Sequence, residues 1–204
     1  MSGPAIIGVL ILGYVLGSIP VGVLAARWIA GTDPRKVGSR NIGFTNVLRV
    51  AGNSAGALTL LGDMGKGVVA VLAARLFLGV AAEDWILAAG GVAILGHVYS
   101  IFLRFTGGKG VATAFGVFLG LDPILGVSLI VIWLISLALW KTSSLAAIIA
   151  FASLPLLTWI RHPEPVMVSF AMGVSALIYY RHTENIRRLL RGAEPKFGME
   201  HKAE

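Results

Sequence analysis

Long apolar runs, separated by short polar stretches, dominate the chain. Most of them approach the ~20 residues that cross a bilayer as a helix. The apolar runs lie at residues 4–30, 54–80, 84–103, 110–121, 124–140, 143–160 and 165–180. This pattern predicts an all-α, polytopic membrane protein with seven transmembrane helices.

Two of these runs depart from a plain membrane span. Run 110–121 is short, and at 1.5 Å per residue it cannot cross a ~30 Å hydrocarbon core unaided. We expect it to extend into its flanks or to enter the membrane partway. Run 54–80 contains Asp63 and Lys66, so we expect its first turns to lie at or within the interface.

Basic residues gather in alternate gaps between the runs. These gaps hold Arg35, Lys36, Arg40 and Arg49, then Arg104 and Lys109, then Lys141, and finally Arg181, Arg187, Arg188, Arg191, Lys196 and Lys202. The remaining gaps hold only Arg161 among basic residues. Cytoplasmic loops carry the excess of Lys and Arg, so we predict an outside N-terminus, a cytoplasmic loop 31–53, a cytoplasmic tail 181–204 and a place in the bacterial inner membrane. Run 110–121 counts as a crossing, because omitting it would reverse every later gap.

Composition supports this class of protein. The chain is 56% hydrophobic and 13% charged, against roughly 45–50% and 25% in soluble domains. The absence of Cys excludes a thiolate nucleophile and a Cys-ligated zinc site. No basic residue precedes the first run, so we expect it to be retained rather than cleaved. We predict one integral membrane domain over 1–204, without a metal site, a cofactor or nucleic-acid binding.

The segment from Gly38 to Arg49 has the composition of a phosphate-binding loop. Glycine allows close backbone approach to a ligand, and Arg49 offers a fixed charge with bidentate geometry for phosphate. The candidate ligands in this segment are Ser39, Asn41, Gly43, Thr45, Asn46 and Arg49. The alternative is a loop that uses Gly, Ser and Asn for turns and a helix cap.

A second polar segment lies inside an apolar run, at Asp63-Met64-Gly65-Lys66-Gly67. Each ionised group near a span centre costs about 2.5–3.5 kcal/mol, and two groups three residues apart offset part of that cost as a pair. The functional interpretation is a cation held toward an anionic site. The alternative is an interfacial pair whose ends reach toward water.

The third segment runs from His97 to Thr113 and contains Gly107-Gly108-Lys109-Gly110. A glycine-rich turn with Lys at the start of a helix is typical of an anion site. It is not a Walker A loop, because the required spacing is absent. The candidate ligands are His97, Ser100, Gly107, Gly108, Lys109, Gly110 and Thr113. The alternative is a plain membrane-entry turn.

The fourth segment follows the last run. His182 and Asn185 lie one turn apart on the same predicted face, and alone the segment is typical of a basic helix on anionic lipid. Ser144 begins another cytoplasmic run, where a helix cap is the simpler explanation. Together the four segments predict an interfacial site for a phosphorylated, amphiphilic substrate.

These segments resemble the PlsY family of glycerol-3-phosphate acyltransferases, and the resemblance covers essentially the whole chain. It rests on Gly38 to Arg49, Asp63 to Gly67, His97 to Thr113 and Arg181 to Glu194. Arg40 stands where the family usually has Gly, and Phe44 where it often has a small residue. These departures alter the loop, but they leave the polar donors in place.

The resemblance implies transfer of a long-chain acyl group from acyl-phosphate to the 1-hydroxyl of glycerol 3-phosphate, giving lysophosphatidic acid and phosphate. It also implies seven spans and an active site on the cytoplasmic side. A mixed anhydride is already activated, so we predict direct attack without a covalent intermediate. The predicted catalytic residues are His182, Asn185, Ser144 and Lys109. Two bases are candidates: His182, oriented by Asn185 or Ser144, and the donor's own phosphate.

Two other classes of protein compete with this interpretation. A transporter of a phosphorylated solute usually has a midplane site and related halves, and the sequence shows neither. A purely structural membrane protein would leave Asp63, Lys66 and Lys109 without a use.

Overall fold

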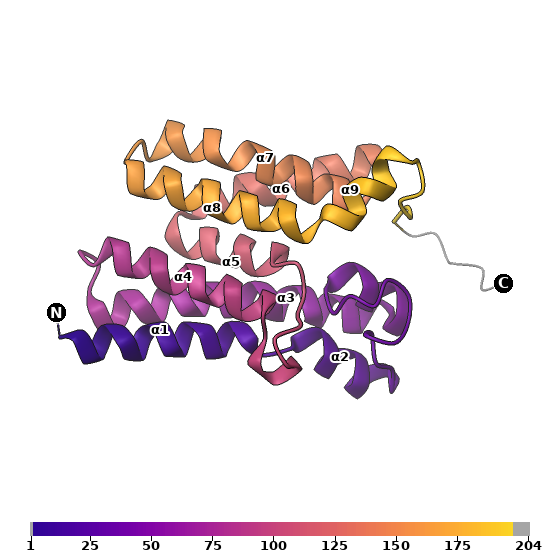
Figure 1. Ribbon diagram of the computed structural model, residues 1–204, viewed down its shortest axis with the longest axis horizontal. Coiled ribbons are helices and arrows are strands. Elements are labelled where there is room, and N and C mark those ends of the chain that lie inside the picture. The colour runs from indigo at the N-terminus through magenta and orange to yellow at the C-terminus, as the bar shows by residue number, and fades with distance from the viewer. Residues whose placement is uncertain (1, 198–204) are drawn as a thin grey trace. The chain divides into compact units, whose positions relative to one another are not determined.

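The computed structural model describes residues 2–197, so residues 198–204 of the predicted cytoplasmic tail lie outside it. The chain folds into two compact units, residues 1–123 and residues 124–204, which Figure 1 shows as ribbons. The α-helices of the first unit are α1 (Gly3–Ser18), α2 (Val21–Ala30), α3 (Phe44–Leu78), α4 (Glu83–Val98) and α5 (Val111–Leu121). Those of the second are α6 (Pro123–Trp140), which begins at the boundary, α7 (Ser143–Arg161), α8 (Pro165–Arg181) and α9 (Thr183–Leu190).

The first apolar run forms two helices rather than one. The break falls at Ile19 and Pro20, where Ile19 has φ −57° and ψ 118°. Proline has no backbone N–H and disfavours helical geometry in the residue before it, so α1 ends one residue before Ile19. Together the two helices cover Gly3–Ala30, which is long enough to cross a membrane.

Helix α3 begins at Phe44, ten residues before the predicted start at 54. The predicted cytoplasmic loop 31–53 therefore ends at Gly43. The early part of α3 is polar and carries no membrane-span signal, but Val47 packs with Ala26 and Ala55 in a buried cluster. Gly52, at φ 85°, kinks the helix between the two parts. Tertiary packing thus decides the structure of this stretch.

Helix α3 is the centre of the first unit and contacts α1, α2, α4 and α5. Glycines allow α3 and α5 to touch backbone to backbone. A Cβ on Gly67 would lie 2.3 Å from the Thr113 carbonyl oxygen, and one on Gly116 would lie 1.9 Å from the Met64 carbonyl oxygen. Small residues permit this close packing of membrane helices, and here it fixes the position of the start of α5.

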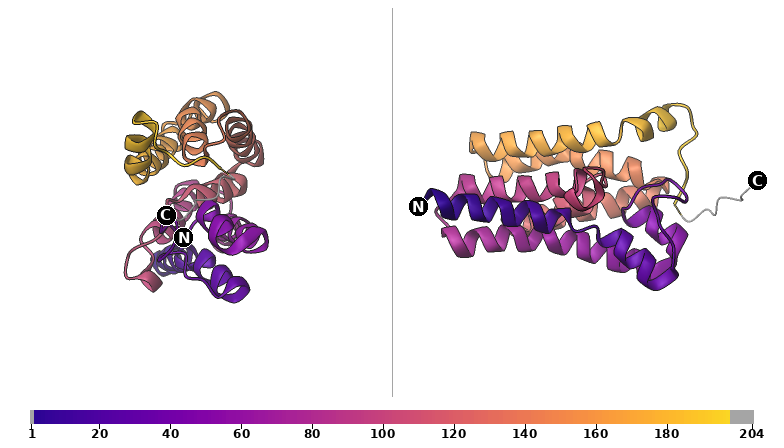
Figure 2. Two further views of the ribbon diagram at one scale, coloured as in Figure 1. Left: turned by 90° about the vertical axis from the view of Figure 1, so that its right-hand side faces the viewer. Right: turned by 60° about the horizontal axis from the view of Figure 1, so that its bottom comes forward.

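The second unit is built on the packing of α7 against α8, which run side by side in both views of Figure 2. The Ser175 hydroxyl donates to the Phe151 carbonyl at 2.8 Å, and the Tyr179 hydroxyl donates to the Ile148 carbonyl at 3.1 Å. Buried polar side chains need such partners. Helix α9 packs on both α7 and α8.

Within residues 2–197, five segments are long and apolar enough to cross a membrane. They are Gly3–Ala30, Phe44–Leu78, Glu83–Leu103, Pro123–Trp140 and Ser143–Arg161. Val111–Leu121 and Pro165–Arg181 are shorter apolar helices. Helix α5 is 11 residues long, or about 16 Å. The all-helical fold is confirmed, whereas seven crossings, their orientation and a single domain stay predictions.

We predict that Gly116→Ala destabilises the protein by about 1–3 kcal/mol, because the added methyl group would overlap the α3 backbone at Met64. Gly65→Ala is the matched control, since Gly65 lies in α3 with nothing near its missing side chain. This control should be neutral or stabilising by up to ~1 kcal/mol. Thermal unfolding in detergent measures both, and equal behaviour of the two variants would contradict the close α3–α5 packing.

Candidate active site

Asn46 organises the loop between α2 and α3. Its amide nitrogen donates to the carbonyls of Pro34 at 2.9 Å, Val37 at 3.2 Å and Asn41 at 2.8 Å. Its amide oxygen accepts the backbone N–H of Ser39 at 2.9 Å. The side chain is buried, so the amide is engaged by the loop itself. Asn46 therefore shapes the segment that carries Ser39 and Asn41.

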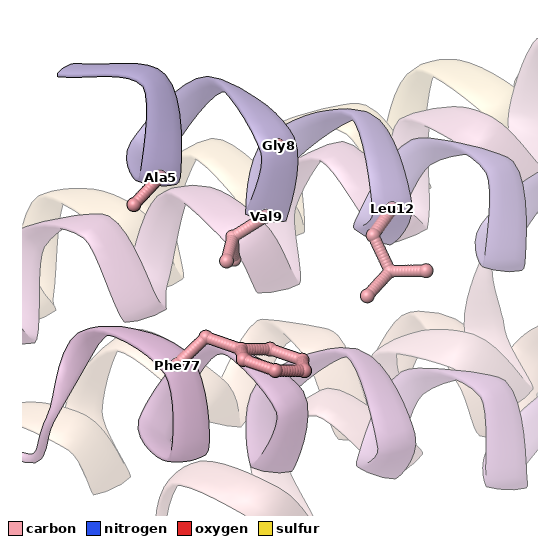
Figure 3. A pocket seen from close by; sticks show the side chains of 5 residues that line it. All are labelled: Ala5, Gly8, Val9, Leu12 and Phe77. Carbon is pink, nitrogen blue, oxygen red and sulfur yellow. The ribbon is translucent and has the colours of Figure 1, made fainter. Parts of the chain in front are cut away.

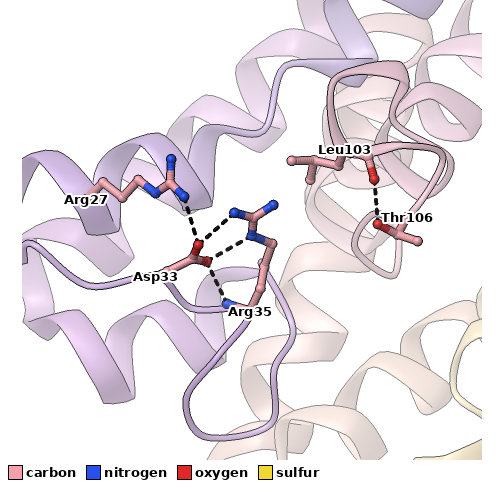
Figure 4. Close-up of polar contacts among 5 residues, drawn as sticks. All are labelled: Arg27, Asp33, Arg35, Leu103 and Thr106. Atoms are coloured by element: carbon pink, nitrogen blue, oxygen red, sulfur yellow. Dashed lines mark hydrogen bonds and ion pairs between the residues drawn. The ribbon is translucent and has the colours of Figure 1, made fainter.

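An ion-pair cluster fixes the beginning of the same loop (Figure 4). The Asp33 carboxylate accepts from the Arg35 guanidinium at 2.9 and 2.6 Å and from Arg27 at 2.8 Å. Hydrogen bonds from Arg35, which outweigh partial desolvation, together with the bond from Arg27, hold the pKa of Asp33 well below its usual range. Both arginines are largely exposed, so their charge also reaches the surface.

Gly43 precedes the first turn of α3, and no side chain caps this helix end. The Asn41 side-chain oxygen accepts the Gly43 N–H at 3.3 Å, which is a local turn. The first N–H groups of a helix have no acceptor within the helix and attract anions. Thr45 and Arg49, both half-buried, lie in the first two turns and add a hydroxyl and a charge.

The second glycine-rich segment leads into α5. Arg104 and Phe105 have left-handed φ values of 53° and 60°, which cost free energy in residues other than glycine. The Thr106 hydroxyl donates to the Leu103 carbonyl at 2.6 Å and closes the turn (Figure 4). Gly110, at φ 89°, precedes α5, and again no side chain caps the helix. Lys109 is half-buried beside it.

The two glycine-rich segments meet in the first unit. Ile42, from the first segment, packs with Leu103, which precedes the second, and with Val23 of α2. A Cβ on Gly22 would lie only 1.9 Å from the Ile42 carbonyl oxygen, so α2 packs directly against the backbone of the first segment. The loop that leads into α3 and the turn that leads into α5 therefore touch at Ile42 and Leu103.

The remaining predicted ligands of the first unit lie deeper. Asp63, Lys66 and His97 form one buried cluster. Ser100 is also buried, and its hydroxyl donates to the Ser18 carbonyl at 2.6 Å. Thr113 is fully buried in the first turn of α5, next to Gly67 of α3. These residues are thus buried inside the first unit, whereas Arg49 and Lys109 are only half-buried.

In the second unit a carboxylate that the sequence analysis did not single out as a ligand connects two predicted catalytic residues. Glu194 Oε1 accepts from the Ser144 hydroxyl at 2.7 Å and from the Asn185 amide at 2.5 Å. Its Oε2 accepts from Arg188 Nε at 2.7 Å. Burial would raise the pKa of Glu194, but the three hydrogen bonds hold it below its usual value. Glu194 thus orients Ser144 and Asn185.

The backbone contributes to the orientation of His182. Its Nδ1 lies 2.8 Å from the Ile178 carbonyl oxygen, which can only accept, so Nδ1 carries the proton. In a neutral imidazole the lone pair then resides on Nε2. The ring is buried, with 3% of its surface exposed. This tautomer suits a proton acceptor.

An apolar groove of about 310 Å³ lies between the first half of α1 and the end of α3. Figure 3 shows Ala5, Val9, Leu12 and Phe77 lining it beside Gly8. Because Ser18 at the other end of α1 meets Ser100, this groove lies at the end of the helices remote from the glycine-rich segments. It offers no group that recognises phosphate.

Known proteins resemble the chain over nearly its full length. The family model "Glycerol-3-phosphate acyltransferase" matches residues 7–192. The glycerol-3-phosphate acyltransferase of Geotalea daltonii is 46% identical over 190 residues, covering 93% of this chain and 96% of the relative. That of Pseudomonas paraeruginosa is 47% identical over 189 residues, covering 92% and 97%.

Solved structures agree with the sequence matches. Two crystal structures of PlsY (YgiH), an integral membrane glycerol 3-phosphate acyltransferase, each cover 96% of both chains. The glycerol 3-phosphate form has a TM-score of 0.89 at 38% identity, and the lysophosphatidic acid form has 0.87 at 36%. The fold and these matches define an integral membrane acyltransferase. The chain belongs to the glycerol-3-phosphate acyltransferase family of the PlsY type.

Glu194 generates a pH-dependent prediction. A carboxyl whose folded pKa is lowered stabilises the fold above its unfolded pKa, near 4.5, and this stability is lost as the pH falls through the folded pKa. We expect Glu194→Gln to lower the free energy of unfolding by about 1–3 kcal/mol at neutral pH. The variant should also lose less stability than the parent between about pH 5 and 3.

Thermal unfolding across this pH range measures the effect. Glu184→Gln is the control, because Glu184 makes only an exposed ion pair with Arg187 and should follow the parent. A Glu194→Gln variant with the parent's pH profile would show that the carboxylate is not held by these bonds.

Proposed function

We propose that this protein transfers a long-chain acyl group from acyl-phosphate to the 1-hydroxyl of glycerol 3-phosphate, giving lysophosphatidic acid and inorganic phosphate. The observation that carries the proposal is that two helix ends preceded by glycine, at the starts of α3 and α5, belong to segments that pack together through Ile42 and Leu103. A single anion needs one such end. Glycerol 3-phosphate and acyl-phosphate each carry a phosphate group, so two such ends suit a phosphorylated acyl donor.

Anion binding is assigned to the first unit. Lys109 and Arg49 supply charge, while the backbone N–H groups at the starts of α3 and α5 supply fixed donors. Ser39, Asn41 and Thr45 add neutral donors. These groups overcome the mutual repulsion of two phosphorylated substrates, and fixed donors need no reorganisation as charge moves during the reaction.

The reaction proceeds by direct attack. The glycerol hydroxyl oxygen bonds to the acyl carbonyl carbon, the bond from that carbon to the phosphate oxygen breaks, and the hydroxyl proton passes to a base. No side chain forms a covalent intermediate, in keeping with a chain that has no Cys. His182 Nε2 is one candidate base, because Nδ1 is engaged by a carbonyl. The donor's phosphate is the other.

We propose further that the chain crosses the bacterial inner membrane seven times with its N-terminus outside. The charge distribution supports this orientation. It directs the loop 31–43, the turn 104–110 and the segment after α8 toward the cytoplasm, where both phosphorylated substrates would be drawn from the aqueous side or the inner leaflet.

The decisive experiment is acyl transfer by the purified full chain in detergent. Palmitoyl-phosphate with labelled glycerol 3-phosphate should give lysophosphatidic acid, whereas palmitoyl-CoA should not, and a metal chelator should leave the rate unchanged. Product from palmitoyl-CoA alone would overturn the proposed donor. Absence of product from both donors in a folded sample would favour the transporter interpretation.

The same assay separates the two candidate bases. If His182 is the base, His182→Gln should lower kcat by about a hundredfold or more and remove a titration from the pH–rate profile. Near-normal turnover of this variant would assign the proton to the donor's phosphate.

Lys109→Ala should lower kcat/KM by about a hundredfold, because a preorganised charge in the anion site contributes ~3 kcal/mol to transition-state stabilisation. Lys36→Ala is the matched control: it removes the same charge from an exposed position in the neighbouring loop and should stay within about threefold of the parent. Initial rates over both substrate concentrations measure the effect. Wild-type kinetics in Lys109→Ala would remove the anion site from this loop.

A further inference from the structure

The buried cluster of Asp63, Lys66 and His97 is enclosed within the first unit. Their exposed fractions are 2%, 7% and 3%. The Lys66 ammonium lies 2.8 Å from Asp63 Oδ1 and 2.9 Å from His97 Nδ1, and His97 Nδ1 lies 3.4 Å from Asp63 Oδ1. Ionised groups at this depth are expensive and commonly functional, yet enclosure of this degree does not suit direct contact with a polyanionic substrate.

The Lys66 ammonium is surrounded by partners within the first unit. It carries three N–H groups, and it meets three partners: Asp63, His97 and the Ile19 carbonyl at 3.0 Å. Ile19 lies at the break between α1 and α2, so this one side chain ties three elements together. The positive charge of Lys66 therefore interacts with groups inside the protein rather than with a ligand.

The same contacts set the orientation and tautomer of His97. A charged ammonium can only donate, so His97 Nδ1 accepts from Lys66, and a neutral ring then carries its proton on Nε2. The Nε2 edge faces the glycine-rich turn, because a Cβ on Gly108 would lie only 2.1 Å from Nε2. The cluster thereby fixes which edge of the imidazole the turn packs against.

The turn also wraps around the backbone of His97. The Gly108 N–H donates to the His97 carbonyl at 3.1 Å, and a Cβ on Gly107 would lie 2.1 Å from that carbonyl oxygen. Gly107 and Gly108 therefore rest on both the main chain and the ring of one residue. Any shift of His97 displaces the turn that ends in Lys109.

We propose that Asp63, Lys66 and His97 form a positioning cluster that holds the turn Gly107–Gly110 in its phosphate-binding conformation. These residues affect the affinity for the phosphate group through the turn and do not touch the substrate. The proposal rests on the proposed function, in which this turn binds a substrate phosphate, and it assigns three of the predicted ligands to an indirect role.

The test is a double substitution that removes both charges. Asp63→Asn and Lys66→Met each leave one buried charge unpaired and should unfold at lower temperature, whereas the combined variant should recover much of the stability. In the combined variant we expect the KM for at least one phosphorylated substrate to rise at least tenfold, with kcat within about threefold of the parent.

A matched control is available at Glu184 and Arg187, which form an exposed pair with the same three-residue spacing. The double variant E184Q/R187M should keep the parent's KM, kcat and unfolding temperature. A stable Asp63/Lys66 double variant with unchanged KM values would overturn the proposal. A fall in kcat of a hundredfold with unchanged KM values would also overturn it, because the cluster would then act on the reacting atoms.

A second readout does not depend on the acyl donor. Glycerol 3-phosphate and inorganic phosphate, each added alone, should raise the unfolding temperature of the parent and have at least a tenfold weaker midpoint in the Asp63/Lys66 double variant. This result would support the cluster's role even if palmitoyl-phosphate failed as the donor. Equal midpoints in parent and variant would refute that role whatever the donor proved to be.

Discussion

The backbone contact between α3 and α5 is the interaction on which the first unit depends. Gly67 and Gly116 let the two helices approach until main-chain atoms touch. In a membrane the hydrophobic effect does little to drive helices together, so close packing of this kind supplies much of the attraction. It brings the start of α5 against α3. The turn Gly107–Gly110, proposed to bind phosphate, is therefore fixed by the packing of these two helices.

Each unit contains one network of polar side chains that find partners within the protein. In the first unit, a lysine within an apolar helix finds an acid, an imidazole and a carbonyl. In the second, Glu194 gathers a hydroxyl, an amide and a guanidinium. Each group would be costly in hydrocarbon without partners. The two networks use different chemistry, but both orient side chains or turns that carry predicted function.

Much of this could be predicted from the sequence. Length and apolarity predicted five of the seven runs as single helices with ends close to those observed, because membrane spans obey a simple length rule. The exceptions have local causes. Pro20 divides the first run, and the polar start of α3 is helical because Val47 packs against Ala26 and Ala55, a contact that no window of sequence contains.

The candidate site was only partly visible in the sequence. Glycine-rich turns followed by apolar runs indicated the two segments that are proposed to bind anions. The sequence could not show that the Asn46 amide is occupied by loop carbonyls, or that Glu194 binds Ser144, fifty residues earlier. Glu194 did leave a signal: it is the sole acid in the basic stretch 185–199, just after Gly192.

The position of Glu194 has a consequence for biosynthesis. The apolar helices α1 to α8 all precede Glu194 in the chain, so this carboxylate is synthesised after every predicted span. Ser144 and Asn185, which donate hydrogen bonds to Glu194, are synthesised before their acceptor. A chain that ended before Glu194 would contain every apolar helix but would lack the acceptor of this polar network. The polar network around Glu194 can therefore form only after every predicted span has been synthesised.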